Sequence, residues 1–310
     1  TSIFCKLMER VTSHDLADHL MQRGLLSKKQ HGFIKGRSTL THLIESVSDW
    51  SLVLDNKRIG SVIYIDFARA FDTVSHPKLL LKLQAYGITG NLLKFVADFL
   101  DNRSQQTRVG RSLSDAKHLM SGVVQGSCLG PLLFLLYVND VLNIFDTAVE
   151  AKMYADDIKL YSCIETITDE FRLQHNLNML VDWAEEWQLS ISISKCSILH
   201  LGAQKMRKST PATYFINRNQ LSDLASVNDL GVTIDEHLSF SKHINNIARK
   251  AHARCSLIMK CFQSKRLDCL VKAYVTYVRP LLEYNSPVWS PHWAKDIRTL
   301  ERVQKRFSKK

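Results

Sequence analysis

The 310-residue sequence is poor in the residues that interrupt packed structure, with only 12 glycines and 6 prolines, and it shows no low-complexity segment and no internal repeat. Long hydrophobic runs are also absent. The longest, residues 129–138, is interrupted by Gly130 and Pro131 and is half the length that a membrane span needs. Its brevity excludes a transmembrane helix. The apolar content of 45% instead predicts a packed globular protein of one large domain or two to three lobes.

The seven cysteines include no Cys-x-x-Cys pair. Their odd number, and a start of the sequence without a secretory signal, favour reduced thiols in an intracellular compartment. Cys255, Cys261 and Cys269 lie in a basic helical region that has no histidine at a zinc-finger spacing. We therefore expect no structural zinc.

Negative charge is scarce in the last quarter of the chain. Residues 242–310 hold 16 Lys and Arg against 4 Asp and Glu, a net charge of +12, whereas the whole chain carries +11. The first 241 residues are thus close to neutral. A basic C-terminal lobe on a neutral body indicates a polyanion bound on one side, most simply nucleic acid. The alternative is a basic face that only meets solvent.

Two adjacent carboxylates, Asp156 and Asp157, lie between the short apolar and aromatic runs 151–154 and 158–161. These runs have the composition of strands, so the acidic pair is predicted at the turn of a hairpin. Two carboxylates a few Å apart repel each other unless a cation lies between them. The pair is either an exposed Asp-Asp turn or half of a divalent-metal site with oxygen ligands suited to Mg²⁺.

A third carboxylate, Asp66, ends the apolar run 61–65, a pattern typical of a buried strand that delivers one acid at its end. Taken alone, Asp66 is also a candidate helix N-cap. A strand ending there, beside the hairpin of Asp156 and Asp157, brings three carboxylates to one point. Such a cluster holds two Mg²⁺ about 3.5–4 Å apart for in-line displacement at phosphorus. Together the two stretches favour the metal site.

Three motifs in this order are highly specific: IDFARAFDTVSH at 65–76, QGSCLGPLLF at 125–134 and YADD at 154–157. In this register the chain resembles the reverse transcriptase of non-LTR (LINE-type) retrotransposons, most of all the jockey-like and chicken-repeat-like branches. The resemblance extends from residue 1 to about residue 306. It implies an RNA-directed DNA polymerase that adds dNTPs to a DNA primer on an RNA template. Two Mg²⁺ per site, with Mn²⁺ as a substitute, are the implied cofactors.

The resemblance also implies roles for individual residues. The implied catalytic residues are Asp66, Asp156, Asp157 and Lys195. The implied metal site consists of Asp66, Phe67, Asp156 and Asp157. The implied nucleotide-binding residues are Phe67, Phe71, Gln125, Gly126 and Arg37.

For Phe71, for Gln125 with Gly126, and for Lys195, the residues also allow a structural alternative. Phe71 is expected to lie under the sugar and to block a 2′-hydroxyl by volume, and the alternative is core packing. Gln125 and Gly126 are expected to meet the incoming nucleotide, and the alternative is a turn that precedes a helix. Lys195 is expected to protonate or neutralise the departing pyrophosphate, and the alternative is an ordinary surface lysine.

The loop at residues 30–39 matches the family's Gln-x-Gly-Phe motif and is rich in hydrogen-bond donors, with Lys35 and Arg37 around Gly36. Glycine lets backbone approach a ligand closely, and arginine can direct two donors onto phosphate. We therefore expect this loop to contact nucleotide phosphate.

The sequence departs from the family pattern at Val124 and Cys128, where proline and valine are usual, and at Ile193 and Ser194, where Asn-Pro is usual. The family's upstream Tyr-Arg-Pro-Ile-Ser-like segment is not in the sequence, so we expect a chain truncated within the fingers. These departures keep open a catalytically dead relic that only binds nucleic acid. A two-metal nuclease is a third reading, but it leaves Phe71 and the basic lobe unexplained.

The expected fold is α+β, a right-hand polymerase with partial fingers at 1–60, an antiparallel-sheet palm with intervening helices at 61–234, and a basic helical thumb at 235–310. A hairpin at 229–235, followed by 238–240, is expected to grip the primer. Helices are expected at 1–26, 40–54, 76–87, 91–100, 132–141, 168–189, 240–263, 267–284 and 295–307.

The expected partners are an RNA template, a DNA primer and dNTPs, without a membrane. Other domains of a longer retroelement protein, an endonuclease among them, are expected outside this sequence. Through the family, the expected location is the nucleus, the cytoplasm or both, as a ribonucleoprotein.

Overall fold

A five-stranded sheet organises the computed structural model, which describes residues 3–101, 103–202, 212–264 and 266–309. Its order is β11 (Ser222–Asp223), β8 (Ser197–Leu201), β1 (Gly60–Ile65), β7 (Asp157–Cys163) and β6 (Glu150–Tyr154), with β6 at one edge. β6 and β7 form an antiparallel hairpin. All but one residue of β1 are fully buried, which agrees with its continuous apolar sequence.

The chain forms two compact units. The first contains Thr1–Ser38, Ser61–Ile198 and Ala212–Ser222, and the second contains Thr39–Gly60, Leu199–Pro211 and Asp223–Lys310. The helix expected at 40–54 thus groups with the C-terminal part of the chain. The three-part division at residues 60 and 234 stays a prediction.

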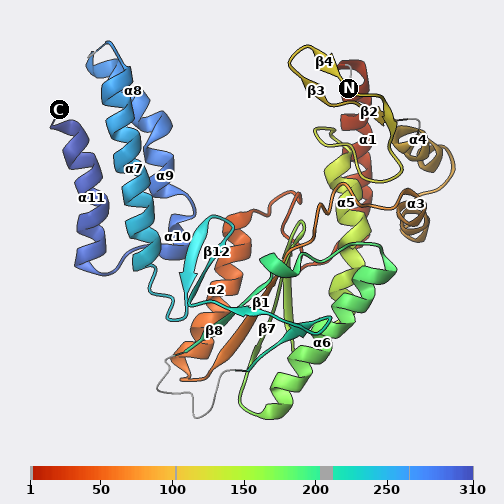
Figure 1. Ribbon diagram of the computed structural model, residues 1–310, viewed down its shortest axis with the longest axis horizontal. Helices are drawn as coiled ribbons and strands as arrows, with labels where there is room; N and C mark the ends of the chain where they lie inside the picture. Colours follow the sequence, from red (N-terminus) through yellow and green to blue (C-terminus); the bar gives the residue numbers. More distant parts are fainter. Residues whose placement is uncertain (1–2, 102, 203–211, 265, 310) are drawn as a thin grey trace. The chain divides into compact units, whose positions relative to one another are not determined.

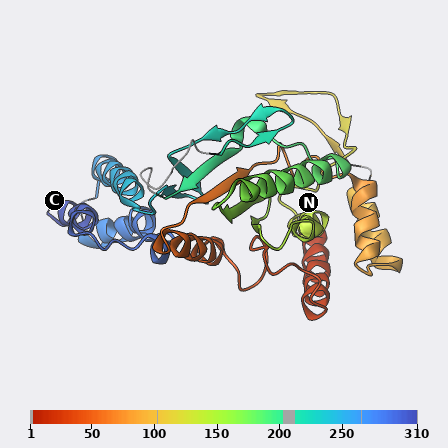
Figure 2. The same ribbon diagram turned by 90° about the horizontal axis from the view of Figure 1, so that it is seen from below.

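Five α-helices belong to the first unit. They are α1 (Ile3–Gln22), α3 (His76–Ala85), α4 (Gly90–Leu100), α5 (Gly130–Val138) and α6 (Ile167–Glu186). Thr166 and Asp169 form a capping box at the start of α6. Helix α6 then packs on β7, and Figure 2 shows it running along the sheet.

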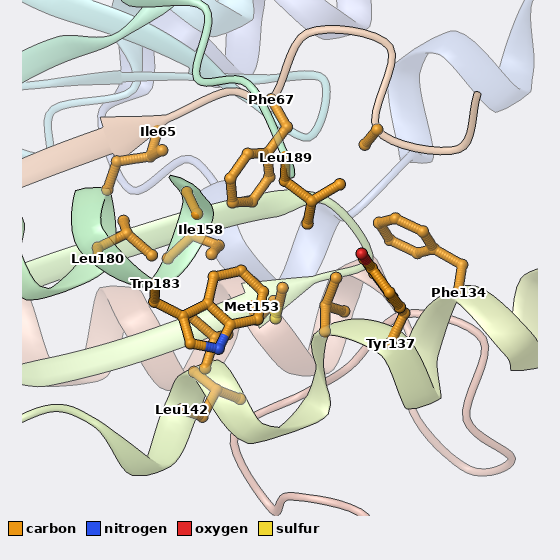
Figure 3. Packing of buried hydrophobic residues seen from close by; sticks show 14 of the residues in the cluster. Ile65, Phe67, Phe134, Tyr137, Leu142, Met153, Ile158, Leu180, Trp183 and Leu189 are labelled. Carbon is orange, nitrogen blue, oxygen red and sulfur yellow. The ribbon is translucent and has the colours of Figure 1, made fainter. Parts of the chain in front are cut away.

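The core of the first unit lies between the sheet and helices α5 and α6. Every residue of α5 except Pro131 is buried, so this helix is apolar on all sides, as its sequence requires. Figure 3 shows Phe67, Tyr137 and Trp183 among the side chains that fill this space. Asp66 is the residue after β1. Because the core packs on both sides of this strand, the packing also fixes the position of Asp66.

Short connecting elements complete the first unit. They are the 3₁₀ turns Asn139–Asn143 and Ile193–Lys195 and the two-residue strands β2 (Ser104–Gln105), β3 (Arg108–Val109), β4 (Ser112–Leu113), β5 (Lys117–His118), β9 (Phe215–Ile216) and β10 (Asn219–Gln220). The second 3₁₀ turn contains Ile193 and Ser194, where the family pattern has Asn-Pro, and Lys195.

The second unit is mostly helical, as expected of a thumb. Its elements are α2 (Thr39–Asp55), β12 (Ser226–Asp229), β13 (Val232–Asp235), α7 (Ser241–Cys261), α8 (Leu267–Tyr277), α9 (Arg279–Glu283), α10 (Ser286–Trp289) and α11 (Ala294–Ser308). Helices α8, α9 and α11 lie around α7 (Figure 1). The side chains of Ala251, Cys255 and Val303 belong to the apolar cluster that joins them.

The hairpin expected at 229–235 is confirmed. β12 and β13 pair antiparallel, with Asp229 opposite Val232. The two loop residues, Leu230 and Gly231, both have positive φ, which is the requirement of a type I′ turn.

One helix prediction is wrong. The sequence predicted a single helix over 267–284, but α8 ends at Tyr277 and α9 begins at Arg279. Pro280 explains the break, because proline lacks the N–H that the helix would use and its ring clashes with the carbonyl four residues earlier.

None of the helices in the described ranges is both long enough and apolar enough to cross a membrane.

Candidate active site

Asp66 lies directly after β1, where a second chain segment holds the backbone. The Ala68 N–H donates to Ser190 O at 2.7 Å, and the Ser192 N–H donates to Asp66 O at 2.8 Å. This short pairing fixes the main chain on both sides of Asp66. It also places Lys195 beside the carboxylate, where Lys195 Nζ donates to Asp66 Oδ1 at 3.1 Å. The Asp66 side chain is 33% exposed, so the ion pair lies at the protein surface.

Asp156 occupies the turn of the β6–β7 hairpin, as the sequence predicted. Tyr154 pairs with Asp157, which leaves Ala155 and Asp156 as a two-residue loop. Ala155 has φ of 56°, a left-handed conformation that residues with a side chain rarely adopt. The hairpin is therefore sharply turned at the residue just before the acidic pair.

Asp66 and Asp156 act on each other electrostatically. Burial raises the pKa of Asp156, and the nearby Asp66 carboxylate raises that pKa further, whereas a backbone hydrogen bond and Lys195 oppose the rise. Two segments 90 residues apart thus bring two acids and one lysine together. Such a group attracts a hard cation, because a cation removes the repulsion between the carboxylates.

Asp157, the third predicted carboxylate, begins β7 and is exposed. Within the ranges that the structure describes, no group of three or more His, Cys, Asp or Glu side chains is arranged to hold a metal ion. The coupled pair is Asp66 with Asp156, and the part of Asp157 in a metal site stays a prediction.

The two predicted phenylalanines differ in their surroundings. Phe67 is buried in the core, so its backbone alone remains for the predicted metal and nucleotide roles. Phe71 is half-buried, and its ring stacks on Phe134 with 4.1 Å between ring centroids. Phe33 meets the same ring edge-on at 6.2 Å. The Phe71 ring is therefore held in one place at the surface of the core.

The loop of Gln125 is tied to the segment just after Phe71. The Val123 N–H donates to Phe71 O at 2.8 Å, and Gln125 Nε2 donates to Asp72 Oδ1 at 2.9 Å. At Gly122, φ is +93° and a Cβ atom would lie 2.8 Å from Asp72 O, so only glycine fits. Gly126, with φ of +79°, continues the loop toward α5. The close approach found here is between Gly122 and Asp72. The contact of Gln125 and Gly126 with the incoming nucleotide stays a prediction.

A polar cleft of about 940 Å³ lies along this loop. Its lining includes Arg69, Asp72, His76, Arg103 and Gln125, all from the first unit. The cleft is lined by basic and amide groups beside the Asp72 carboxylate.

Arg37 has different contacts from those expected. Its Nη1 donates to Ser27 O at 3.0 Å, to Lys28 O at 2.9 Å and also to Gln30 O. The guanidinium therefore holds its own loop together. Its role as a phosphate ligand stays a prediction.

Sequence reasoning missed two residues beside the acidic turn, Gln30 and Gly32. The Gln30 side chain hydrogen-bonds the backbone of Ala155, and Gly32 lies against the same residue. The Gln-x-Gly-Phe loop was singled out, but for contact with nucleotide phosphate around Gly36. The close approach in the structure is that of Gly32 to Ala155. Ala155 is 125 residues from Gln30, so local spacing does not reveal it as a partner.

Comparison with known proteins agrees with these features. Residues 1–234 match the family described as reverse transcriptase (RNA-dependent DNA polymerase). The chain is 29% identical over 294 residues to the RNA-directed DNA polymerase from mobile element jockey of Drosophila melanogaster, covering 92% of this chain and 32% of that protein. It is 28% identical over 304 residues to the probable RNA-directed DNA polymerase from transposon BS of the same organism, covering 93% and 33%.

Solved structures show a similar fold. Telomerase from Candida albicans, determined with a fragment of telomeric RNA, aligns with a TM-score of 0.56 at 11% identity over 97% of this chain and 56% of that chain. Apo telomerase from Candida tropicalis aligns with a TM-score of 0.52 at 10% identity over 97% and 54%. The right-hand polymerase fold is confirmed.

The chain spans about a third of the length of the curated relatives. With the family match covering most of its length, the chain belongs to the reverse transcriptase family, and the predicted resemblance to the non-LTR retrotransposon branch is confirmed.

Proposed function

We propose that this chain is the polymerase part of a retroelement protein and extends a DNA 3′-end on an RNA template. The observation that carries the proposal is the meeting of Asp66, at the end of β1, with Asp156, in the β6–β7 turn. Nucleotidyl transfer needs two acids fixed close together on separate segments. Backbone pairing holds Asp66 in place, and the hairpin holds Asp156. The two carboxylates therefore do not have to be ordered at each turnover, which would cost entropy.

The donor set fits Mg²⁺, because carboxylate oxygens are its preferred protein ligands and the two acids repel each other when no cation balances them. Asp66 and Asp156 would hold two Mg²⁺ per site, or Mn²⁺ in their place, with Asp157 and the backbone of Phe67 as further ligands. When bound, Mg²⁺ lowers the pKa of the primer 3′-hydroxyl and stabilises charge on the transferring phosphate.

The surrounding side chains would select and orient the nucleotide. The ring of Phe71, fixed by stacking on Phe134, would block a 2′-hydroxyl by volume and so favour dNTPs. Gln125 and Gly126 would meet the nucleotide from the adjoining loop. Lys195, 3.1 Å from Asp66, would supply a proton or positive charge to the departing pyrophosphate. Arg37 would contribute through guanidinium nitrogens other than Nη1.

The whole retroelement protein is proposed to carry further domains, such as an endonuclease, because the curated relatives are about three times as long. The net charge of +12 over residues 242–310 supports binding of the template–primer backbone by the second unit. Work in the nucleus, the cytoplasm or both, as an intracellular ribonucleoprotein, is proposed through the family.

Primer extension tests the proposal, with a DNA primer on an RNA template, dNTPs, Mg²⁺ and low salt. Asp66→Asn and Asp156→Asn remove one metal-binding carboxylate each. Each variant is expected to lose more than about 100-fold in extension, since changes even outside the metal ligands cost 10–100-fold. Binding of the RNA–DNA duplex is expected to stay unchanged.

Asp98→Asn, an exposed acid on α4, is the matched control and is expected to extend like the unaltered chain. Extension by Asp66→Asn at the control rate would overturn the metal assignment. A chain that binds duplex tightly but extends no primer would instead be a relic that only binds nucleic acid.

A further inference from the structure

We infer that Gln30 is a positioning residue that holds the Ala155–Asp156 turn in the geometry needed for metal binding. The inference rests on the proposed function and assigns it a residue outside the acidic motifs. Gln30 Oε1 accepts hydrogen bonds from the N–H of Ala155 at 3.0 Å and of Gly32 at 2.6 Å. Gln30 Nε2 donates to Ala155 O at 3.4 Å. One amide thus contacts both the N–H and the carbonyl of the residue before Asp156.

The backbone around Gln30 pairs with the open edge of the sheet through a single bridge. The Met153 N–H donates to Lys29 O at 3.0 Å, and the His31 N–H donates to Met153 O at 2.8 Å. Gln30 itself forms a parallel bridge with Met153. Because β6 is an edge strand, residues 29–31 cover groups that would otherwise lack a partner strand.

Gly32 closes the other side of the turn. A Cβ atom at Gly32 would lie 2.4 Å from the backbone N of Ala155, far inside contact distance, and backbone cannot move aside as a flexible side chain can. Ala155 is therefore held between the Gln30 amide and the Gly32 main chain. This confinement stabilises the left-handed φ of 56° that Ala155 adopts.

We call the contacts of Gln30 and Gly32 with Ala155 the clamp. Arg37 stabilises the segment that bears it. Its Nη1 donates to Gln30 O and to the carbonyls of Ser27 and Lys28, so the segment that bears Gln30 is itself braced. Gln30 is only 1% exposed. A buried amide with its donor and acceptor both satisfied is costly to remove, which makes it a rigid support.

The clamp acts on the residue next to Asp156. The Asp156 carboxylate lies beside Asp66, and repulsion between the two acids pushes the turn away from β1. A support that acts on the main chain of Ala155 resists this displacement without adding charge. The expected result is a site arranged for a cation before the cation arrives.

The test uses Gln30→Leu, which keeps the approximate size of the side chain and removes all three hydrogen bonds. The matched control is Gln174→Leu. Gln174 Oε1 accepts from the Phe215 N–H at 2.8 Å, and Gln174 Nε2 donates to Phe215 O at 2.9 Å, so the same kind of clamp is lost elsewhere in the first unit. Mn²⁺ binding to the full chain, followed by electron paramagnetic resonance without nucleic acid, is the first measurement.

Gln30→Leu is expected to weaken Mn²⁺ binding by roughly 10-fold or more, the usual effect of removing a group that orients a metal ligand. It is also expected to raise the Mg²⁺ concentration for half-maximal extension while leaving the KM for the primer–template unchanged. Backbone amides of residues 153–157 should exchange hydrogen faster. Gln174→Leu should change none of these three quantities.

Unchanged Mn²⁺ binding in Gln30→Leu, with weak binding in Asp156→Asn, would overturn the clamp and leave the proposed function intact. Unchanged binding in Asp156→Asn would instead overturn the metal site itself. If Gln30→Leu does not fold, Gln30→Asn keeps the amide but is too short to reach Ala155. The same weakening is expected of Gln30→Asn, and its absence would likewise refute the inference.

Discussion

Single residues of the site owe their positions to packing more than to their own chemistry. Phe71 is held by Phe134 on one face and by Phe33 at its edge. Sequence reasoning left selection of the sugar and core packing as alternatives for Phe71. The ring contacts confirm packing against the core. Selection of the sugar stays a prediction that is compatible with this packing, because a ring fixed by the core can exclude a group by volume.

Phe71→Val tests this selection. The smaller side chain opens the space expected for a 2′-hydroxyl, so discrimination against ribonucleotides is expected to fall by roughly 10–100-fold, the range for a change of a few methylenes in a pocket. The measurement is the ratio of kcat/KM for a dNTP and the matching rNTP. Phe95→Val, which shortens another half-buried ring against the same core, is the control. An equal change in both variants would point to general loosening and against selection.

A site residue could be predicted where the residues that fix its position lie close to it in the sequence. Asp156 was placed correctly at a turn because its two strands lie within residues 150–163, a range where local pattern decides structure. The role of Gln30 was not predictable, since its partner is 125 residues away and an amide binds phosphate and backbone equally well. Lys82, on the helix expected at 76–87, is another residue whose surroundings local pattern did not reveal. It lies buried, 3.5 Å from the ring centroid of Trp187, and burial lowers its pKa to about 8.

Among the elements, α7 and β13 are joined by a buried histidine. The Thr233 N–H donates to His243 Nδ1 at 3.1 Å, and the imidazole lies 5.1 Å from the ring of Trp289. Burial lowers the pKa of His243 to about 4, and Lys250 contributes in the same direction. The histidine is therefore neutral in the folded protein at neutral pH.

Because of this histidine, we expect the free energy of unfolding of the second unit to depend on pH. As pH falls from 6.5 to 4, the unfolded chain takes up a proton that folded His243 does not, so the free energy of unfolding decreases over that window. The full loss is about 3 kcal/mol for a difference of some 2.5 pH units. Denaturant unfolding followed by tryptophan fluorescence measures it.

His243→Asn keeps an acceptor near the position of Nδ1 and does not titrate. Its unfolding midpoint is expected to vary less between pH 6.5 and 4 than that of the unaltered chain. An identical pH profile in the two proteins would exclude His243 as the source.

Helix prediction succeeded where the local sequence signals agreed, and it failed where a proline opposed the apolar spacing. Helix α6 carries both a capping box and an amphipathic repeat, and it was placed within three residues at each end. The region 267–284 also has apolar spacing, but Pro280 ends the hydrogen-bond ladder regardless of that spacing.

For the whole molecule, the separation of charge is the main feature that sequence alone establishes. Helix α11 bears exposed Lys295, Arg298, Arg302, Lys305 and Arg306 along its length. The division of the chain into compact units was less accessible, because α2 precedes the sheet in sequence yet groups with the C-terminal helices. Nothing local in residues 39–55 signals that grouping.

Removing charge from α11 tests whether this surface binds nucleic acid. Arg302→Ala with Arg306→Ala is expected to weaken binding of an RNA–DNA duplex and to reduce the slope of log affinity against log salt by roughly one to two. Lys6→Ala with Arg10→Ala removes the same charge at the same spacing from exposed positions of α1. Equal slopes for the two double variants would argue against a specific role of α11.

The 125 residues between Gln30 and Ala155 also have a consequence for how the protein is made. A ribosome adds roughly 5–20 residues per second, so Gln30 leaves it roughly 6–25 s before its partner does. Lys195 comes another 40 residues later. Before Asp156 is made, the growing chain has neither a braced turn nor a complete pair of acids. A nascent chain released before that point therefore lacks the pair of acids on which the proposed chemistry depends.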